Sequence, residues 1–138
     1  MGSNTIRYAG EKDFETISKH DKHIRETELK NAIALKRVLV MYQNDHFAGW
    51  LRFNLFWDEI PFMNMLYLLE EYRGQGYGRQ LVMFWEKEMK ESGYGMVLTS
   101  TLSSEQAQFF YRKNGYVDCG SLMLPEEPLE IILRKGLG

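Results

Sequence analysis

Three glycines and two arginines occupy a short stretch, "RGQGYGR" from Arg73 to Arg79, directly before a run with helical periodicity. The apolar segment 62–69 precedes this stretch. The first N–H groups of a helix lack partners within the helix and carry partial positive charge. Glycines let the backbone approach an anion closely and take positive φ angles. The pattern therefore predicts an anion site, with Arg73 and Arg79 able to add charge-assisted hydrogen bonds to a phosphate.

Three known phosphate-binding patterns can be compared with this loop. The P-loop requires a lysine followed by a hydroxyl residue after its last glycine, and neither is present. The dinucleotide fingerprint is G-x-G-x-x-G, whereas this chain has G-x-G-x-G, and the strands upstream read as antiparallel hairpins. The third pattern, [QR]-x-x-G-x-[GA], is met by Arg73, Gly76 and Gly78. Taken alone, this match is also compatible with a purely structural turn between a strand and a helix.

Hydrophobic periodicity and turn residues predict the elements that must position the loop. Strands are expected at 4–9, 38–42, 47–55, 62–69, 96–101, 116–124 and 129–134, and helical segments at 11–24, 25–36, from the glycines to about Ser92, and from about Ser103 to Asn114. Ser103 and Ser104 are expected to cap the last helix, with Glu105 in its first turn. The predicted fold is a single α/β domain, 1–138, of order β-α-α-β-β-β-α-β-α-β-β, with a mixed sheet and helices on both faces.

A second motif lies more than thirty residues after the loop. The segment "AQFFYRKNGY", Ala107 to Tyr116, looks like the A-x-x-F-Y-x-x-x-G-[FY] of the GNAT superfamily of N-acetyltransferases. The glycine loop, the element order and the motif spacing together resemble this family over nearly the whole chain. The resemblance implies an acetyl-CoA-dependent enzyme with a splayed fourth and fifth strand, in which the pantetheine arm lies between those strands.

The resemblance also implies roles for individual residues. Tyr111 occupies the position of the family's general acid, which protonates the departing sulfur; the alternative role is that of a packed helix aromatic. Ser104 stands where many members have a coenzyme-contacting asparagine, so that contact is open. The coenzyme-binding residues implied by the resemblance are Leu66, Leu68, Leu69, Arg73, Gly74, Gln75, Gly76, Tyr77, Gly78, Arg79 and Ser104.

The general base and the acceptor are less well defined by the sequence. Four turn carboxylates could relay a proton, although each reads more simply as a solvated side chain: Asp58, Glu59, Glu70 and Glu71. Candidate acceptor-binding residues are Arg52, Asn54, Trp57 and Glu59. Arg52 could hold a substrate carboxylate, but a salt bridge or a strand-edge charge is the simpler interpretation. The acceptor is expected to be a primary amine of a small molecule or a protein.

Composition excludes several other classes of protein. The chain has 138 residues and a net charge of -2, which gives no bulk attraction to nucleic acid or anionic lipid. It has no apolar run of membrane-spanning length and no signal-peptide core at its start. The lone Cys119 cannot form an internal disulfide, which is compatible with a reducing compartment, so a cytoplasmic location is expected. Cys119 lies in a predicted strand and is expected to be buried. Met1 to Ser3 are compatible with a vector-derived remnant.

The sequence also leads to expectations about metal binding, self-association and alternative functions. His20 and His23 lack a third ligand nearby, so no metal site is expected. A homodimer is an open expectation, because exposed last strands often pair in the GNAT family. Two alternatives to the enzyme stay open: a non-catalytic acyl-CoA-binding or sensing domain on the same fold, and a nucleotide-binding module that uses the loop for another phosphate ligand.

Overall fold

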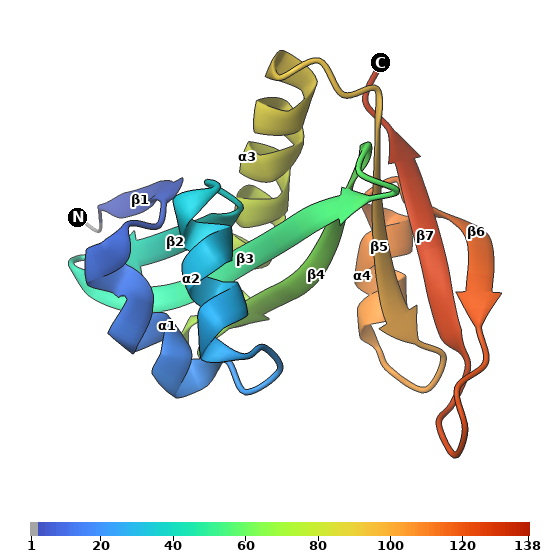
Figure 1. Cartoon of the computed structure of the whole chain (residues 1–138), viewed down its shortest axis with the longest axis horizontal. Coiled ribbons are helices and arrows are strands. Elements are labelled where there is room, and N and C mark those ends of the chain that lie inside the picture. The colour runs from blue at the N-terminus through green and yellow to red at the C-terminus, as the bar shows by residue number, and fades with distance from the viewer. Residues whose placement is uncertain (1–2) are drawn as a thin grey trace. The chain divides into compact units, whose positions relative to one another are not determined.

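The computed structural model describes residues 3–138, so the first two residues of the suggested vector remnant lie outside the described part. The fold is mixed α/β, as the sequence predicted (Figure 1). Its strands are β1 Asn4–Tyr8, β2 Val38–Gln43, β3 His46–Phe56, β4 Ile60–Leu68, β5 Met96–Leu102, β6 Val117–Leu122 and β7 Glu130–Gly136. Its α-helices are α1 Phe14–His20, α2 Glu26–Ala34, α3 Tyr77–Glu91 and α4 Ala107–Lys113, and the 3-10 turns are η1 Glu11–Asp13 and η2 Glu70–Tyr72.

The strands form one mixed sheet in the order β1-β2-β3-β4-β5-β7-β6. The pairs β1–β2, β2–β3, β5–β7 and β6–β7 are antiparallel. The pair β4–β5 is parallel and is recorded at Phe62 with Leu98 and at Met63 with Thr99, both early in β4. The seven strands and their order along the chain agree with the sequence prediction.

The chain divides into two compact units. Unit 1 comprises Met1–Asn54 and Met65–Trp85, and unit 2 comprises Leu55–Asn64 and Glu86–Gly138. The glycine loop belongs to unit 1, whereas the second motif belongs to unit 2. Each unit is therefore described by itself.

Unit 1 is built around two helices packed on an antiparallel sheet. Ile17 of α1 and Leu29 of α2 are fully buried against Val38 and Val40 of β2 and Trp50 of β3. Burying each of these side chains contributes about 1.5–3 kcal/mol. This core fixes the positions of β2 and β3. The residue directly after β4 bonds to β3, so the core also positions the glycine loop that follows β4.

The first helical segment ends earlier than predicted. A helix was expected over 11–24, but α1 ends at His20 and Asp21 is extended, with φ -91° and ψ 103°. The Asp21 carboxylate accepts hydrogen bonds from the indole of Trp50 at 3.0 Å and from Arg52 Nε at 2.7 Å. These tertiary bonds, which link residues about thirty positions apart, turn Asp21 out of the helix.

Unit 2 is built around β5 and β7, with β6 as the outer strand. Val97 and Leu133 are fully buried. All residues of β6 are exposed, including Cys119, which is a free thiol. The expectation that Cys119 is buried was wrong. A register shift between Asp118 and Gly120 leaves Cys119 without a partner residue on β7, in a strand whose outer side is solvated.

The last helix begins later than predicted. The expectation that Ser103 and Ser104 cap it was wrong: both lie in an exposed turn and α4 begins at Ala107. The turn is closed by its own bonds, since Glu105 N–H donates to Leu102 O at 2.9 Å and the Glu105 carboxylate accepts from Leu102 N–H at 3.1 Å. The carboxylate that was expected to support the helix start instead stabilises the preceding turn.

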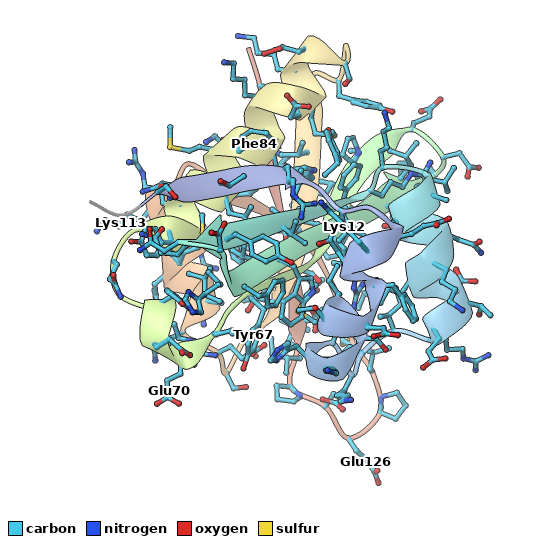
Figure 2. All side chains as sticks on the ribbon, turned by 90° about the vertical axis from the view of Figure 1, so that its left-hand side faces the viewer. Lys12, Tyr67, Glu70, Phe84, Lys113 and Glu126 are labelled. Atoms are coloured by element: carbon cyan, nitrogen blue, oxygen red, sulfur yellow. The ribbon has the colours of Figure 1, made fainter. Side chains whose placement is uncertain are left out.

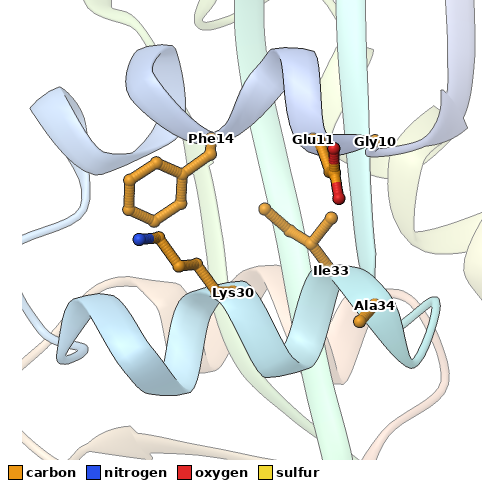
Figure 3. A pocket seen from close by; sticks show the side chains of 6 residues that line it. All are labelled: Gly10, Glu11, Phe14, Lys30, Ile33 and Ala34. Carbon is orange, nitrogen blue, oxygen red and sulfur yellow. The ribbon is translucent and has the colours of Figure 1, made fainter.

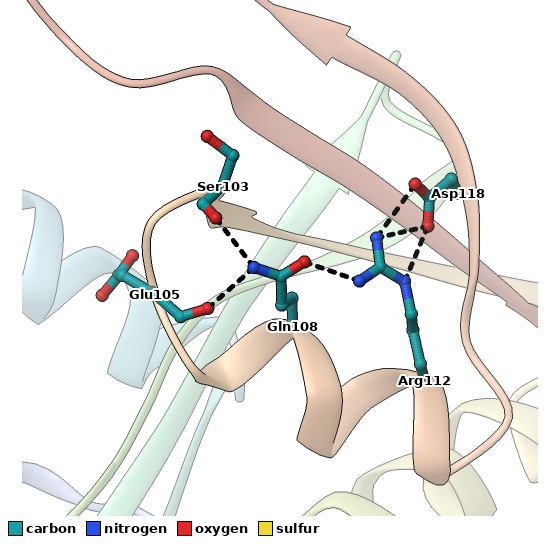
Figure 4. Close-up of polar contacts among 5 residues, drawn as sticks. All are labelled: Ser103, Glu105, Gln108, Arg112 and Asp118. Carbon is teal, nitrogen blue, oxygen red and sulfur yellow. Dashed lines mark hydrogen bonds and ion pairs between the residues drawn. The ribbon is translucent and has the colours of Figure 1, made fainter.

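Side chains of α4 hold that turn and the following strand (Figure 4). Gln108 Nε2 donates to the backbone oxygens of Ser103 at 2.8 Å and Glu105 at 3.1 Å. Arg112 donates to Gln108 Oε1 at 2.6 Å and to both carboxylate oxygens of Asp118. The turn that contains Ser104 is therefore fixed by contacts within unit 2.

Candidate functional site

The glycine loop has the backbone geometry that the sequence predicted. Gly74 and Gly76 have φ of +74° and +85°, in the left-handed region that favours glycine. A Cβ built at either position would meet no atom within 4 Å, so the space beside the backbone is open. An anion can therefore approach this backbone without displacing a side chain.

The helix after the loop begins directly beside the glycines. It begins at Tyr77, so Gly78 and Arg79 lie in its first turn rather than before it. A bond from Gln80 N–H to Gly76 O at 3.1 Å joins the loop to this turn. The N–H groups of Tyr77 and Gly78 are first-turn donors with no carbonyl one turn earlier in the helix. With the helix dipole, they form a site suited to a negatively charged phosphate.

Arg73 is held at the mouth of this site by two contacts. Its Nε donates to Leu68 O at 2.8 Å, and its guanidinium lies 4.9 Å from the centre of the Tyr67 ring. These contacts orient the guanidinium, while the terminal nitrogens of this exposed side chain remain able to meet an anion. The sequence placed Arg73 beside the loop, but it did not single out Tyr67, the tyrosine that supports the guanidinium.

A hydrogen bond to the preceding turn η2, which contains two glutamates, also stabilises the loop. Gln75 Nε2 donates to Glu71 O at 3.1 Å. Glu70 and Glu71 are exposed in η2, and Figure 2 shows the Glu70 side chain pointing away from the ribbon. Neither carboxylate takes part in a recorded ion pair within residues 3–138. Both therefore have the solvated-turn geometry that was the simpler sequence interpretation.

The end of β4 lies unusually close to β3. A Cβ on Gly49 would be 2.4 Å from Tyr67 O and 2.6 Å from Leu68 Cδ2, so only glycine fits there. Leu69 N–H donates to Ala48 O at 2.8 Å, and Leu69 O accepts from Tyr72 N–H at 2.9 Å. Leu66 and Leu68 are partly buried on the same strand. The amide of Leu69 is thus engaged within the protein, and the coenzyme contacts that the resemblance implies for Leu66, Leu68 and Leu69 stay a prediction.

In unit 2, Tyr111 is buried, and Thr99 is one of the residues that influence its hydroxyl. Thr99 Oγ1 donates to Met63 O at 3.0 Å, which fixes the Thr99 side chain. Burial raises the pKa of Tyr111 to about 12. Tyr111 therefore keeps its proton across the neutral pH range, as a general acid must.

A buried network supports the Tyr111 ring. Tyr116 packs edge-on to it, with ring centres 5.6 Å apart. The hydroxyl of Tyr116 donates to Glu86 Oε2 at 2.7 Å, and Lys135 Nζ donates to Glu86 Oε1 at 2.9 Å. Burial and the Glu86 carboxylate both raise the pKa of Tyr116. Tyr116 therefore remains a neutral phenol that packs against Tyr111 and fixes its orientation.

The proposed acceptor residues have varied environments. Arg52 is buried and donates to both oxygens of Asp21, so it takes the salt-bridge role that the sequence analysis held simpler. Asn54 is exposed near the end of β3. Trp57 and Glu59 are exposed in the turn between β3 and β4, which belongs to unit 2. Within residues 3–138, no group of three or more His, Cys, Asp or Glu residues could hold a metal ion.

A pocket of about 470 Å³ lies between the first two helices in unit 1 (Figure 3). Lys30 Nζ lies 4.9 Å from the centre of the Phe14 ring at one end, and Glu11 and Ile33 line the other. None of the residues that line it was singled out in the sequence, and none belongs to the glycine loop: Gly10, Glu11, Phe14, Lys30, Ile33 and Ala34. Within the described residues, no helix is both long and apolar enough to span a bilayer.

The fold and loop define an α/β protein with a glycine loop at the start of the helix that follows its fourth strand. The family model "Acetyltransferase (GNAT) family" matches residues 7–116. The chain belongs to the GNAT acetyltransferase family. A search of curated protein sequences found no matching relative.

Solved structures with the same fold are similar over nearly the whole chain. Ard1 from Thermoplasma volcanium has 15% identity and a TM-score of 0.82, covering 96% of this chain and 97% of its own. The PaiA N-acetyltransferase from Thermoplasma acidophilum, in complex with coenzyme A, has 19% identity and a TM-score of 0.78, covering 97% and 99%. The ribosomal-protein-S18-alanine N-acetyltransferase from Escherichia coli has 17% identity and a TM-score of 0.80, covering 99% and 95%. At these identities the similarity establishes the fold.

Proposed function

We propose that this protein is an acetyl-CoA-dependent N-acetyltransferase that moves an acetyl group to a primary amine of a small molecule or protein. The observation that carries the proposal is the open glycine loop at the start of α3, with Gly74 and Gly76 at positive φ and Arg73 oriented beside them. Membership of the GNAT family and a coenzyme A complex among the structures of similar fold support the choice of ligand.

The loop residues fit a pyrophosphate on physical grounds. The first-turn N–H groups of Tyr77 and Gly78 and the guanidinium of Arg73 would hold its charge, because both are oriented before binding. Gln75 and Arg79 would add polar contacts, and Leu66 and Leu68 would line the pantetheine arm. Ser104 remains a candidate contact through its hydroxyl, since it lies exposed in the turn before α4.

Acetyl-CoA, when bound, supplies a thioester-activated acetyl group. The role proposed for Tyr111 is to hold a proton on its phenol oxygen for the departing sulfur. The acceptor amine must be neutral to attack, and it can lose its proton to water. Asn54, Trp57 and Glu59 stay candidates for acceptor contacts because all three are exposed. A reducing, cytoplasmic location is also proposed, since the single cysteine is free and exposed.

Calorimetry with acetyl-CoA, ATP and NAD tests the ligand assignment. Acetyl-CoA should bind in preference to the other two. Gly76→Val should weaken acetyl-CoA binding at least about tenfold, because its left-handed φ disfavours a β-branched residue at a cost of about 1–3 kcal/mol. Gly136→Ala, on β7 in open space and without a positive φ, is the matched control and should bind normally. Failure of wild-type protein to bind acetyl-CoA would reject the proposal.

A panel of primary amines, assayed by release of coenzyme A, then separates the enzyme from a non-catalytic acyl-CoA-binding domain. The enzyme should release coenzyme A with at least one amine, in a reaction that depends on Tyr111. A binding domain would hold acetyl-CoA without amine-dependent release. A homodimer formed through the exposed β6 is also proposed, and its test is argued in the Discussion.

A further inference from the structure

The turn between β3 and β4 has a backbone that one of its residues, Trp57, does not favour. Glu59 N–H donates to Phe56 O at 3.1 Å, and the central residues Trp57 and Asp58 have φ of +56° and +61°. This is the pattern of a type I′ hairpin turn, which favours Asn, Asp and Gly. In the left-handed region the Cβ of a bulky residue crowds the next carbonyl. Turn geometry therefore does not explain a tryptophan at position 57.

The tryptophan is also unusually exposed. We call Phe56, Trp57, Asp58 and Glu59 the hairpin tip. Trp57 is 74% exposed and Phe56 is 36% exposed. The ring centres of Trp57 and Phe56 are 4.6 Å apart, and Phe62 lies 6.0 Å beyond Phe56. The three rings make a fixed aromatic surface, of which the outer ring stands in water and would gain from being covered.

The charges at the hairpin tip define what can cover it. Asp58 and Glu59 are exposed, and no cation of residues 3–138 forms a recorded ion pair with either carboxylate. An aromatic face attracts a cation through its ring quadrupole, and tryptophan does so best. The same carboxylates repel the phosphates of nucleic acids and of anionic lipids. The surface is thus complementary to a cation carried on an apolar stem.

We propose that the hairpin tip is a docking surface for a segment of a partner protein that carries lysine or arginine side chains. The methylene stem of such a side chain covers the Trp57 ring, and its charged end reaches Asp58 or Glu59. Trp57 and Glu59 are also candidate acceptor contacts in the proposed function, whereas docking at the hairpin tip is measured by peptide binding alone and does not require acetyl transfer.

The three tryptophans of the chain provide a direct readout. Trp50 and Trp85 are 1% and 0% exposed, so fluorescence accessible to acrylamide comes from Trp57. The probe is a short synthetic peptide that alternates arginine with glycine and leucine. It should protect Trp57 from quenching at low ionic strength and less so in salt. A matched peptide with glutamate in place of arginine should give no protection.

A turn-optimised variant separates binding from folding. Trp57→Asn combined with Asp58→Gly installs the preferred type I′ residues, so its melting temperature should match or exceed that of wild type. Its affinity for the fluorescein-labelled arginine peptide, measured by anisotropy, should fall at least about fivefold. Phe109→Leu removes a 57% exposed ring from α4 and should leave the affinity unchanged.

Four results would overturn the proposal. The turn-optimised variant could bind the arginine peptide as well as wild type does, or the glutamate peptide could bind equally. Vesicles of neutral phosphatidylcholine could protect Trp57 where the arginine peptide does not, which would assign the tip to a membrane. Protection that grows with protein concentration in the absence of peptide would assign it to a second copy of this chain.

Discussion

At the scale of single residues, the role proposed for Tyr111 requires its phenol to stay protonated. Burial favours this because it raises the pKa of Tyr111. Replacing Tyr111 by Phe removes the hydroxyl while keeping the ring that packs on Tyr116. We expect kcat to fall at least about tenfold at saturating acetyl-CoA, because a positioned general acid contributes at least that much. Coenzyme A release measured against acetyl-CoA concentration should show a nearly unchanged KM.

The pH profile gives a second readout of Tyr111. Because burial raises its pKa to about 12, its ionisation should cause no loss of kcat between neutral pH and about pH 10. Tyr94→Phe removes a hydroxyl that belongs to neither motif and should leave both kcat and its pH dependence unchanged. An unaltered kcat in Tyr111→Phe would assign Tyr111 to packing alone, which was the alternative reading of the motif.

Residue types with a special backbone requirement were the most predictable from sequence. The loop glycines were expected to allow positive φ, and Gly74 and Gly76 have it because they lack a Cβ, whereas Gly78 lies in α3 without it. Tyr67, Thr99 and Gly49 were missed. Their roles arise from contacts with residues distant in the chain, such as Thr99 with Met63 O and Gly49 with Tyr67 O, and no local spacing signals such contacts.

At the scale of elements, sequence periodicity found every strand but misplaced two helix ends. The segment 11–24 looked helical throughout, because the polarity of Asp21 does not distinguish a solvated helix face from a buried ion pair. The last helix was given a serine cap, yet Glu105 stabilises a turn that competes with it. In both cases a polar side chain had two acceptable roles: Asp21 took the one that tertiary contacts offered, and Glu105 took a local one in the turn before the helix.

The Asp21–Arg52 pair fixes the segment between α1 and α2 to β3 and should make stability depend on acid pH. Burial opposes the charge on Asp21, but the hydrogen bond and positive charge of Arg52 outweigh it, so the pKa of Asp21 is lowered. A lowered pKa contributes stability above the unfolded pKa of about 3.9, and that stability is lost as pH falls through the folded pKa. The pair should therefore stabilise the protein fully at neutral pH.

Asp21→Asn should lower the free energy of unfolding by about 3 kcal/mol at pH 7, because it leaves Arg52 buried without its counter-charge. The difference from wild type should shrink as pH falls below about 4, where the unfolded chain protonates, and through the lowered folded pKa of Asp21. Urea unfolding of wild type and Asp21→Asn, at pH 7 and again below about pH 4, measures this difference in the free energy of unfolding. Asp118→Asn, in the more exposed pair with Arg112, should cost less than about 1 kcal/mol. A difference independent of pH would mean that Asp21 acts through its hydrogen bonds alone.

At the scale of the whole molecule, the order of elements and the two motifs were enough to predict the family, which the family model confirms. A strand order of β5-β7-β6 also leaves β6 as an outer strand, with its backbone groups unpaired on one side. Every residue of β6 is exposed, and the apolar Val117 and Leu122 are 47% and 50% exposed. Such an edge is a template for pairing with another strand unless charge or proline blocks it.

Pairing of β6 with β6 of a second copy would give the unpaired backbone groups partners and cover Val117 and Leu122. A two-fold arrangement of the two copies would make the contact self-complementary. Sedimentation velocity should therefore show dimers whose fraction rises with concentration. Leu122→Lys places a charge on the edge and should give a monomer that still binds acetyl-CoA. Leu35→Lys, at a 59% exposed site after α2, adds the same charge and should still dimerise. A wild-type protein that stays monomeric as concentration rises would show that β6 remains an edge protected only by its bulge at Cys119 and the neighbouring charge of Asp118.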